Sequence, residues 1–150
     1  MSLRLLKLLP EQVARYWELL CPMIESTLLP IVGEDVGRMN SILSSILSGN
    51  MDVVQFFDLV DDEVTVKGFA VVSVIMSVDW TEKQLLVYSI YGYETVGKRS
   101  IIEGLKLLME YAAGEECSSL VAYTNLKGLI EYTKRLGGNA DYTFIKLGVR

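Results

Sequence analysis

The stretch Ser89–Leu105, SIYGYETVGKRSIIEGL, joins two different sequence patterns. It begins in a run rich in β-branched and aromatic residues, passes two glycines and two basic residues, and continues with apolar residues at helical spacing. This order predicts a strand, a turn and a helix. The first amides of such a helix have no partner within the helix and lie at the positive end of its dipole, so the junction can hold a phosphate. An ordinary turn with solvated cations explains the same residues.

The composition of the whole chain predicts one compact domain. The chain has 150 residues, of which 51% are hydrophobic and 22% are charged. This is enough for one sizeable core and too little for two large domains, so we expect residues 1–150 to form a single domain. The net charge is −5 and the basic residues are scattered, which argues against nucleic acid as a partner.

The sequence also predicts a cytoplasmic protein without a membrane partner. No apolar run reaches the roughly 18 residues that a membrane-spanning helix needs. The segment Met1–Pro10 lacks the pattern of a cleaved signal peptide.

The absence of histidine limits the chemistry of the chain. With no histidine and two cysteines, Cys21 and Cys117, the chain has neither a Ser-His-Asp nor a Cys-His catalytic pair. Two cysteines alone do not make a structural zinc site, so no metal is predicted. Each cysteine is most simply explained as a small core residue.

The first half of the chain predicts one strand and two helices, followed by a meander. A short strand over Leu5–Leu9 precedes a helix that starts at Pro10. Because Pro22 removes a backbone donor, we expect a kink or two shorter helices, with the interruption near Cys21-Pro22. A second helix covers Val36–Leu47. Three strands separated by short polar turns then predict an antiparallel meander: Asp52–Val60, Val64–Val78 and Lys83–Tyr91.

The middle strand of this meander is apolar on both sides. Alternation places seven residues on one face: Val64, Val66, Gly68, Ala70, Val72, Val74 and Met76. It places Phe69, Val71 and Ile75 on the other face. A strand of this kind should be covered on both faces.

The second half of the chain predicts a crossover. The pattern indicates a helix from Ile101 to Gly114, a strand over Ser118–Thr124, a helix over Leu126–Thr133 and a last strand over Tyr142–Leu147. A strand–helix–strand unit puts parallel pairing beside the antiparallel meander. The predicted fold class is therefore α+β, with a mixed sheet and helices on both of its faces.

This order of elements, with four short motifs, resembles the GNAT superfamily, the Gcn5-related N-acetyltransferases. The resemblance covers nearly the whole chain as topology but is carried by few residues. Lys67-Gly68-Phe69-Ala70 is similar to the family's GxA segment, and Gln84–Tyr91 to its fourth strand. Thr124-Asn125 resembles its fifth strand end, and Arg135-Leu136-Gly137-Gly138 the end of the following helix.

The resemblance implies acetyl-CoA as co-substrate. In that family the fourth strand leads into Q/R-x-x-G-x-G/A, whose amides hold the pyrophosphate. Here the matching residues are Glu94-Thr95-Val96-Gly97-Lys98-Arg99, which retain only the first glycine, so the motif is degenerate. Lys98 and Arg99 could compensate by pairing with phosphate directly. The implied cofactor contacts are Ser89, Ile90, Tyr91, Val96, Gly97, Lys98, Arg99, Ser100 and Asn125.

The catalytic residues follow from the same resemblance. Family members commonly use a tyrosine four residues before the helix-ending glycine as general acid, and that place holds Thr133. Its neighbour Tyr132 serves only if the helix end is shifted, because one residue rotates a side chain by about 100°; an ordinary packed tyrosine explains it equally well. As general base the sequence offers the carboxylates Asp58, Asp79 and Glu82, or else a water or the substrate's own amine.

The leading hypothesis is an acetyl-CoA-dependent N-acetyltransferase. A primary amine of a small molecule or peptide would attack the thioester directly, while backbone N–H groups near Ser89–Tyr91 polarise its carbonyl. The alternative is a catalytically inactive GNAT-like binding or interaction module, which the degenerate motif favours and with which a homodimer through an exposed sheet edge is compatible. A third alternative is an unrelated α+β domain.

Overall fold

The computed structural model describes residues 3–28, 37–92 and 98–149, and the Lys98 side chain is outside this description. Glu94, Val96 and Gly97 of the predicted phosphate motif therefore lie outside the described residues. The first half contains β1 (Leu3–Lys7), α1 (Pro10–Arg15), α2 (Trp17–Thr27), α3 (Arg38–Leu47), β2 (Asp52–Val60), β3 (Glu63–Met76) and β4 (Lys83–Gly92). The second half contains α4 (Lys98–Gly114), β5 (Ser119–Ala122) and α5 (Lys127–Arg135).

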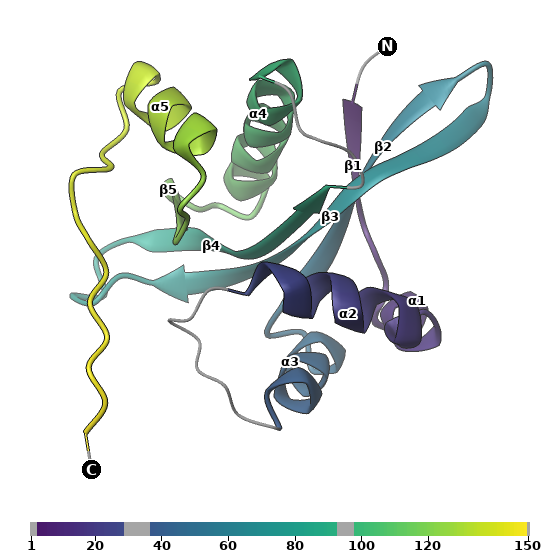
Figure 1. The fold of residues 1–150 in the computed structure, drawn as a ribbon, viewed down its shortest axis with the longest axis horizontal. Helices are drawn as coiled ribbons and strands as arrows, with labels where there is room; N and C mark the ends of the chain where they lie inside the picture. The colour runs from purple at the N-terminus through teal and green to yellow at the C-terminus, as the bar shows by residue number, and fades with distance from the viewer. Residues whose placement is uncertain (1–2, 29–36, 93–97, 150) are drawn as a thin grey trace.

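The strands form one mixed sheet in the order β1-β2-β3-β4-β5. The first four strands pair antiparallel, and β5 pairs parallel to β4. The predicted meander and crossover are thus confirmed, because α4 carries the chain from one end of β4 back to the start of β5 (Figure 1).

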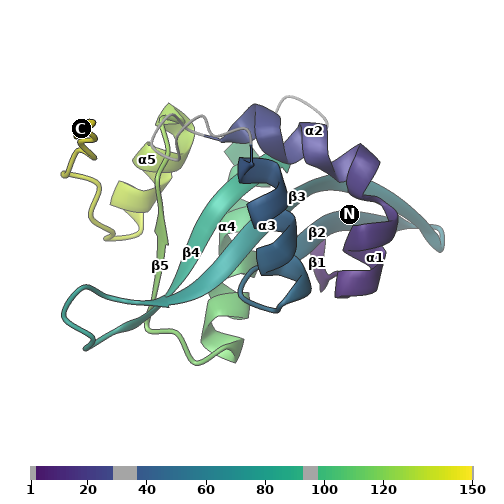
Figure 2. The same ribbon diagram turned by 90° about the horizontal axis from the view of Figure 1, so that it is seen from below.

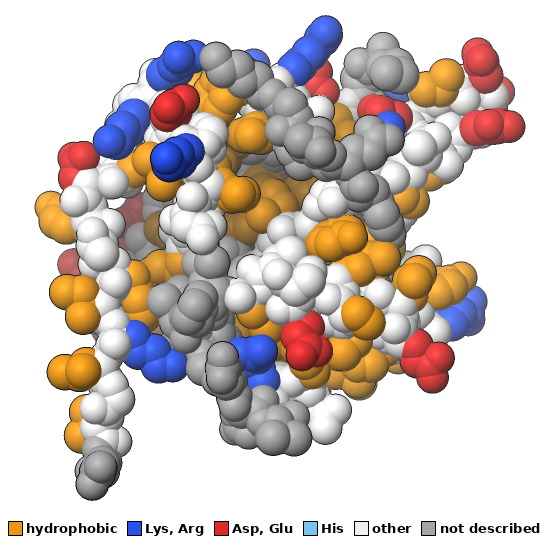
Figure 3. Space-filling view, viewed as in Figure 1, with side chains coloured by type: hydrophobic (Ala, Val, Ile, Leu, Met, Phe, Trp, Pro, Cys, Tyr) orange, Lys and Arg blue, Asp and Glu red, His pale blue; other side chains and the backbone are white. Residues whose placement is uncertain are grey.

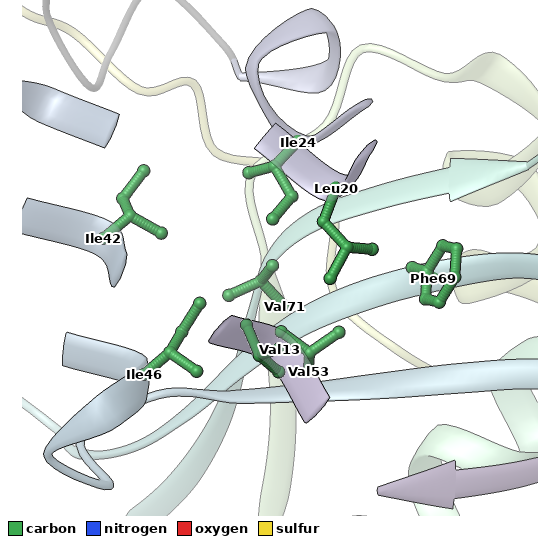
Figure 4. Close-up of a cluster of buried hydrophobic side chains, with 8 residues drawn as sticks. All are labelled: Val13, Leu20, Ile24, Ile42, Ile46, Val53, Phe69 and Val71. Atoms are coloured by element: carbon green, nitrogen blue, oxygen red, sulfur yellow. The ribbon is translucent and has the colours of Figure 1, made fainter. Parts of the chain in front are cut away.

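Helices cover the sheet on both faces, as predicted (Figure 1). On one side α1, α2 and α3 bury a cluster that includes Val53, Phe69 and Val71 from the sheet (Figure 4). On the other side Leu108 and Ala112 of α4 pack on sheet residues that include Val72 and Leu85. None of the described helices has the length and apolar character needed to cross a membrane.

Two shorter helices form, as one of the predicted alternatives, but the position predicted for the break, near Cys21-Pro22, is wrong. The chain leaves helical geometry at Tyr16, with φ −104° and ψ 17°, and α2 then runs through Pro22 without interruption. A proline leaves the carbonyl four residues earlier without its usual helical donor. Here that carbonyl belongs to Glu18, which lies in the first turn of α2. The missing hydrogen bond therefore falls at the start of the helix, just after the break at Tyr16.

The face predicted for β3 is also partly wrong. Phe56 stands opposite Gly68 while its neighbour Phe57 stands opposite Val66, so Lys67 is an extra residue in β3. This β-bulge reverses the alternation. Val66 consequently packs with Phe69 on the side of α1–α3. Ala70 and Val72 share the face toward α4, and their shared face agrees with the prediction.

The terminal strands differ from the prediction at both ends. β1 spans Leu3–Lys7 instead of Leu5–Leu9, and β5 is shorter than the predicted Ser118–Thr124. The predicted last strand over Tyr142–Leu147 is wrong, because these residues form no strand in the structure. A strand is stabilised by hydrogen bonds to its neighbours, and none of the described strands pairs with this segment.

Candidate functional site

The candidate site lies where β4 and β5 part. The two strands pair from Gln84 opposite Ser119 to Val87 opposite Ala122, and the pairing ends there. β4 continues to Gly92 and pairs with β3 alone. Figure 2 shows the two strands separating toward their C-terminal ends. Within the described residues, the outer edge of Tyr88–Gly92 therefore faces no strand.

A second β-bulge lies at this point. Val72 stands opposite Val87 and Val71 opposite Ser89, which leaves Tyr88 as the extra residue in β4. A bulge bends its strand and increases the local twist. It also turns the side chains over: Leu85 belongs to the cluster under α4, whereas Ser89 lies opposite Val71 of the α1–α3 cluster. Sequence alternation alone gives no sign of this reversal.

Ser89 links the open half of β4 to the end of α2. It is 5% exposed, and its Oγ lies 2.5 Å from Oγ1 of Thr27. The Thr27 hydroxyl donates to the carbonyl oxygen of Ile24 at 2.9 Å. Because that hydroxyl has one proton, Ser89 is the donor to Thr27. The predicted cofactor-contact residue Ser89 therefore also positions the strand.

Gly68 holds β3 close to the same half of β4. A Cβ atom at this position would lie 2.2 Å from the carbonyl oxygen of Tyr91 and 3.2 Å from Cα of Gly92. Only glycine allows this approach without a backbone shift. The glycine of the Lys67–Ala70 segment thus has a physical role in shaping the site.

The first turn of α4 borders the site. β4 ends at Gly92 and α4 begins at Lys98. Ser100 is exposed, and the Arg99 side chain is 89% exposed and pairs with Glu103, with Nε and Oε1 3.4 Å apart. Arg99 is therefore turned along the helix surface and leaves the backbone of the first turn uncovered by its own side chain. The first amides of an α-helix have no partner within the helix.

The chain after β5 and the helix α5 form the other flank. Asn125 is exposed just before α5, and α5 packs on α4, where a Cβ on Gly128 would lie 3.2 Å from Cδ1 of Ile101. Tyr132 is 8% exposed, and the Arg135 guanidinium lies 5.5 Å from its ring centre, a cation–π arrangement. The Thr133 hydroxyl donates to the Leu129 carbonyl at 2.8 Å. Tyr132 is thus a largely buried side chain of α5 that packs beside Arg135.

Two of the predicted catalytic carboxylates lie elsewhere. Asp79 and Glu82 are in the β3–β4 turn, and Glu82 is seven residues before Ser89, about 20 Å along an extended strand. Hydrogen bonds from Thr81 and Ser77 lower the pKa of Asp79 to about 2. The Ser119 and Ser118 hydroxyls lower the pKa of Glu82. The structure does not bring these two residues to Ser89, and carboxylates held in the ionised form are weak bases.

Asp58 lies under α4 instead. It is 8% exposed and lies two residues beyond Phe56 on the same side of β2. A Cβ on Gly104 would lie 4.0 Å from Cε1 of Phe56, so Asp58 is placed toward the start of α4.

Sequence reasoning missed three residues near the bulge. Tyr88 is partly buried, and burial raises the pKa of its hydroxyl, while the nearby Arg38 guanidinium opposes that rise. The Nε atom of Arg38 is buried and has no hydrogen-bond partner among the described residues. Thr27 reaches Ser89 across 62 positions of sequence. No local pattern could have connected these residues.

The architecture is that of the GNAT acetyltransferases, which confirms the fold that the resemblance implied. The chain has a mixed sheet with an antiparallel meander and a crossover helix, and β4 parts from the edge strand β5. A GNAT family acetyltransferase from Staphylococcus aureus superposes with a TM-score of 0.65 at 10% identity, over 99% of this chain and 100% of that one. Ribosomal-protein-alanine N-acetyltransferase from Brucella melitensis gives 0.63 at 12% identity, over 99% and 100% of the chains.

A third similar structure, a putative acetyl transferase from Pyrococcus furiosus, gives a TM-score of 0.61 at 15% identity, over 99% of this chain and 100% of that one. By sequence, no protein-family model and no curated protein matches the chain. At these identities the likeness is one of fold, which agrees with the few motif residues that the chain retains.

Proposed function

We propose that this protein is an acetyl-CoA-dependent N-acetyltransferase that acts on a primary amine of a small molecule or peptide. The observation that carries the proposal is the parting of β4 from β5 after Val87. An open strand edge offers N–H and C=O groups to an extended ligand with amide groups, which the pantetheine arm of acetyl-CoA has. The first turn of α4 offers amides to the pyrophosphate.

The residues present fit this co-substrate. Arg99 replaces a family glycine, but its side chain points to solvent and Glu103, so it does not cover the helix start. We assign the other contacts to residues of the elements around this opening: Ser89, Ile90 and Tyr91 on β4, Ser100 on α4, and Asn125 after β5. Val96, Gly97 and Lys98 complete the proposed contact set from the connection into α4.

The proposed reaction is direct transfer. Backbone N–H groups in Ser89–Tyr91 polarise the thioester carbonyl, and the amine nitrogen attacks the carbonyl carbon. As the C–S bond breaks, Tyr132 gives a proton to the leaving thiolate. The chain has no histidine, and Asp79 and Glu82 lie at the far end of β4. The amine therefore attacks after losing its proton to water.

Calorimetric titration with acetyl-CoA tests the co-substrate. We expect a dissociation constant in the micromolar range for the unmodified protein and loss of binding in Gly97→Glu, because the new carboxylate repels the pyrophosphate. The matched control is Gly114→Glu, which adds the same charge at the other end of α4, where a Cβ meets nothing within 4 Å. Failure of the unmodified protein to bind acetyl-CoA at millimolar concentration would contradict the proposal.

Tyr132→Phe tests the general acid. Loss of a positioned acid lowers turnover by about 10²–10⁴-fold, and the affinity for acetyl-CoA should stay the same. Release of free thiol during incubation with a panel of primary amines gives the rate. Unchanged turnover in Tyr132→Phe would remove this role from Tyr132.

The degenerate phosphate motif favours a second candidate, an inactive binding or interaction module with the same fold. Here acetyl-CoA binding without turnover of any amine in the panel, or no binding at all, is the expected result. Either outcome distinguishes this module from the proposed enzyme.

A further inference from the structure

Arg38, the first residue of α3, has a buried donor without an acceptor among the described residues. The donor is the Nε–H of its guanidinium. The ion pairs within the described part of the chain join Lys7 to Asp52 and Arg99 to Glu103, and neither involves Arg38. A buried donor without an acceptor lowers stability, so a group of this kind in a folded protein calls for an explanation.

The start of α3 is more favourable for an anion than for a cation. The positive end of a helix dipole lies at its first residue, which here is Arg38. A carboxylate in the first turn would balance the positive charge, but the first turn of α3 contains no acidic residue. The guanidinium and the helix dipole therefore attract the same kind of partner, a negatively charged group.

Arg38 also lies beside the open half of β4. Burial raises the pKa of the Tyr88 hydroxyl, and the Arg38 guanidinium is near enough to oppose that rise. Tyr88 packs on the cluster under α1–α3, and the next residue, Ser89, meets Thr27 at the end of α2. Consecutive Cα atoms are about 3.8 Å apart. A group bound by the guanidinium therefore lies beside the strand residues to which we assign the thioester.

A carboxylate fits this position better than a phosphate does. The Nε–H and one Nη–H of a guanidinium are parallel donors, which match the two oxygens of a carboxylate. The Tyr88 hydroxyl adds a further donor, because its raised pKa keeps it protonated at neutral pH. The chain has a net charge of −5, which repels a phosphate dianion more strongly than a monoanion.

The acidic run of the β2–β3 hairpin lies away from this position. Asp61, Asp62 and Glu63 follow one another at its turn. Figure 3 shows acidic side chains gathered at the tip of the hairpin. In Figures 1 and 2 this tip projects from the body of the protein, away from α3. This run therefore does not oppose a carboxylate at Arg38.

We propose that Arg38 binds a carboxylate of the acceptor, so that the preferred substrate is a primary amine that also carries a carboxylate group. This inference rests on the proposed acetyl transfer and adds the class of acceptor to it. Arg38 is the residue that determines specificity, and the Tyr88 hydroxyl gives a second, weaker contact. The amine of the acceptor takes no part in these contacts and attacks the thioester.

Calorimetric titration with matched ligands tests the contact without turnover. The probes are glycine, β-alanine, γ-aminobutyrate and ε-aminocaproate, each compared with its own carboxamide, with and without coenzyme A. We expect at least one acid to bind about 10- to 100-fold more tightly than its carboxamide, the usual range for hydrogen bonds to a charged group. Equal affinity of acid and carboxamide at every chain length, or binding of none of the acids, would overturn the proposal.

Substitution of Arg38 locates the preference. Arg38→Gln should abolish the preference for the acid and leave the affinity for the carboxamides unchanged, because glutamine has neither the charge nor the parallel donors. Arg38→Lys keeps the charge and should restore part of the preference. The matched control is Arg15→Gln, which removes the same charge from an exposed position of α1. A preference that survives in Arg38→Gln would disprove the role of Arg38.

Tyr88→Phe keeps the proposal testable if the Arg38 variants do not fold. It removes one hydroxyl and should weaken binding of the preferred acid about fivefold, the usual effect of one hydrogen bond, with no change for its carboxamide. The same change for acid and carboxamide, or no change for either, would show that no carboxylate lies between Tyr88 and Arg38.

Acetyl transfer to the same probes separates this inference from the proposed function. We expect the preferred acid to exceed its carboxamide in kcat/KM by about the factor found for binding. If the acids bind through Arg38 and no amine is acetylated, the carboxylate site is correct and the proposed function is wrong. If acids and carboxamides are acetylated with equal kcat/KM, the proposed function is correct and this inference is wrong.

Discussion

The two halves of β4 differ in the number of strands that they pair with. Lys83–Val87 lies between β3 and β5, and Leu85 within it is completely buried. Ser89–Gly92 pairs with β3 alone, and Ile90 within it is 38% exposed. One extra residue, Tyr88, separates the two halves. The site therefore arises where sheet pairing is interrupted, whereas the paired half supplies stability.

The largest effect is expected from the paired half. Leu85→Ala should lower the free energy of unfolding by about 2–5 kcal/mol, because it leaves a cavity in a fully packed cluster. Ile90→Ala, in the open half, should change it by less than about 1 kcal/mol. Urea denaturation followed by circular dichroism measures both. Similar losses in the two variants would contradict the difference between the halves.

A glycine substitution tests how β3 shapes the open half. Gly68→Ala should cost about 1–3 kcal/mol, because its Cβ would meet the Tyr91 backbone and force the two strands apart. It should also weaken acetyl-CoA binding, since Tyr91 borders the site. In Gly104→Ala the Cβ meets only Phe56 at 4.0 Å, so stability should rise by up to about 1 kcal/mol in this helical control. A loss of stability in both variants, or a gain in both, would contradict this explanation.

The hydroxyl pair between α2 and the open half should have a smaller effect. Ser89→Ala and Thr27→Val should each lower the free energy of unfolding by about 1 kcal/mol, the usual contribution of one hydrogen bond. Because both variants break the same bond, the double variant should lose less than the sum. A double-mutant cycle from urea denaturation measures this coupling. Strict additivity would show that the two hydroxyls act independently.

The smallest effect is expected at the far end of the paired half, in the β3–β4 turn. The pKa of Asp79 is lowered from 3.8 to about 2 by hydrogen bonds from Thr81 and Ser77. A lowered pKa in the folded state stabilises the protein above the unfolded pKa, and this contribution disappears as the pH falls from about 4 through 2. Asp79→Asn should therefore reduce the urea midpoint slightly at pH 7 and not at pH 2. An equal reduction of the urea midpoint at both pH values would contradict a stabilising role for the ionised Asp79 carboxylate.

The fold was largely predictable because its signals are local. The β-rich runs that became β2, β3 and β4 are separated by short polar turns, and the apolar period after Ser100 identifies α4. The errors fall where neighbours decide the outcome. The bulge at Lys67 moved Val66 to the other face, and Tyr142–Leu147 pairs with none of the described strands.

The candidate site was predictable only in part. Ser89–Tyr91 and the start of α4 follow each other in the chain, so one strand-to-helix pattern identifies both. Asp79 and Glu82 were chosen because they lie near the meander in sequence, but a strand separates its two ends by its full length. Thr27 and Arg38 could not be found from any local pattern, because α2 and α3 meet β4 only after folding.

The sequence alone determined the periodicities, and with them the order of helices and strands, the mixed sheet and the glycine-containing junction. These features depend on residues close together in the chain, whose spacing decides which face is apolar. Only the tertiary structure decided where β4 leaves β5, which hydroxyl meets Ser89 and which strand edge is left unpaired. These depend on register between strands, and one extra residue such as Tyr88 shifts that register without changing the local pattern.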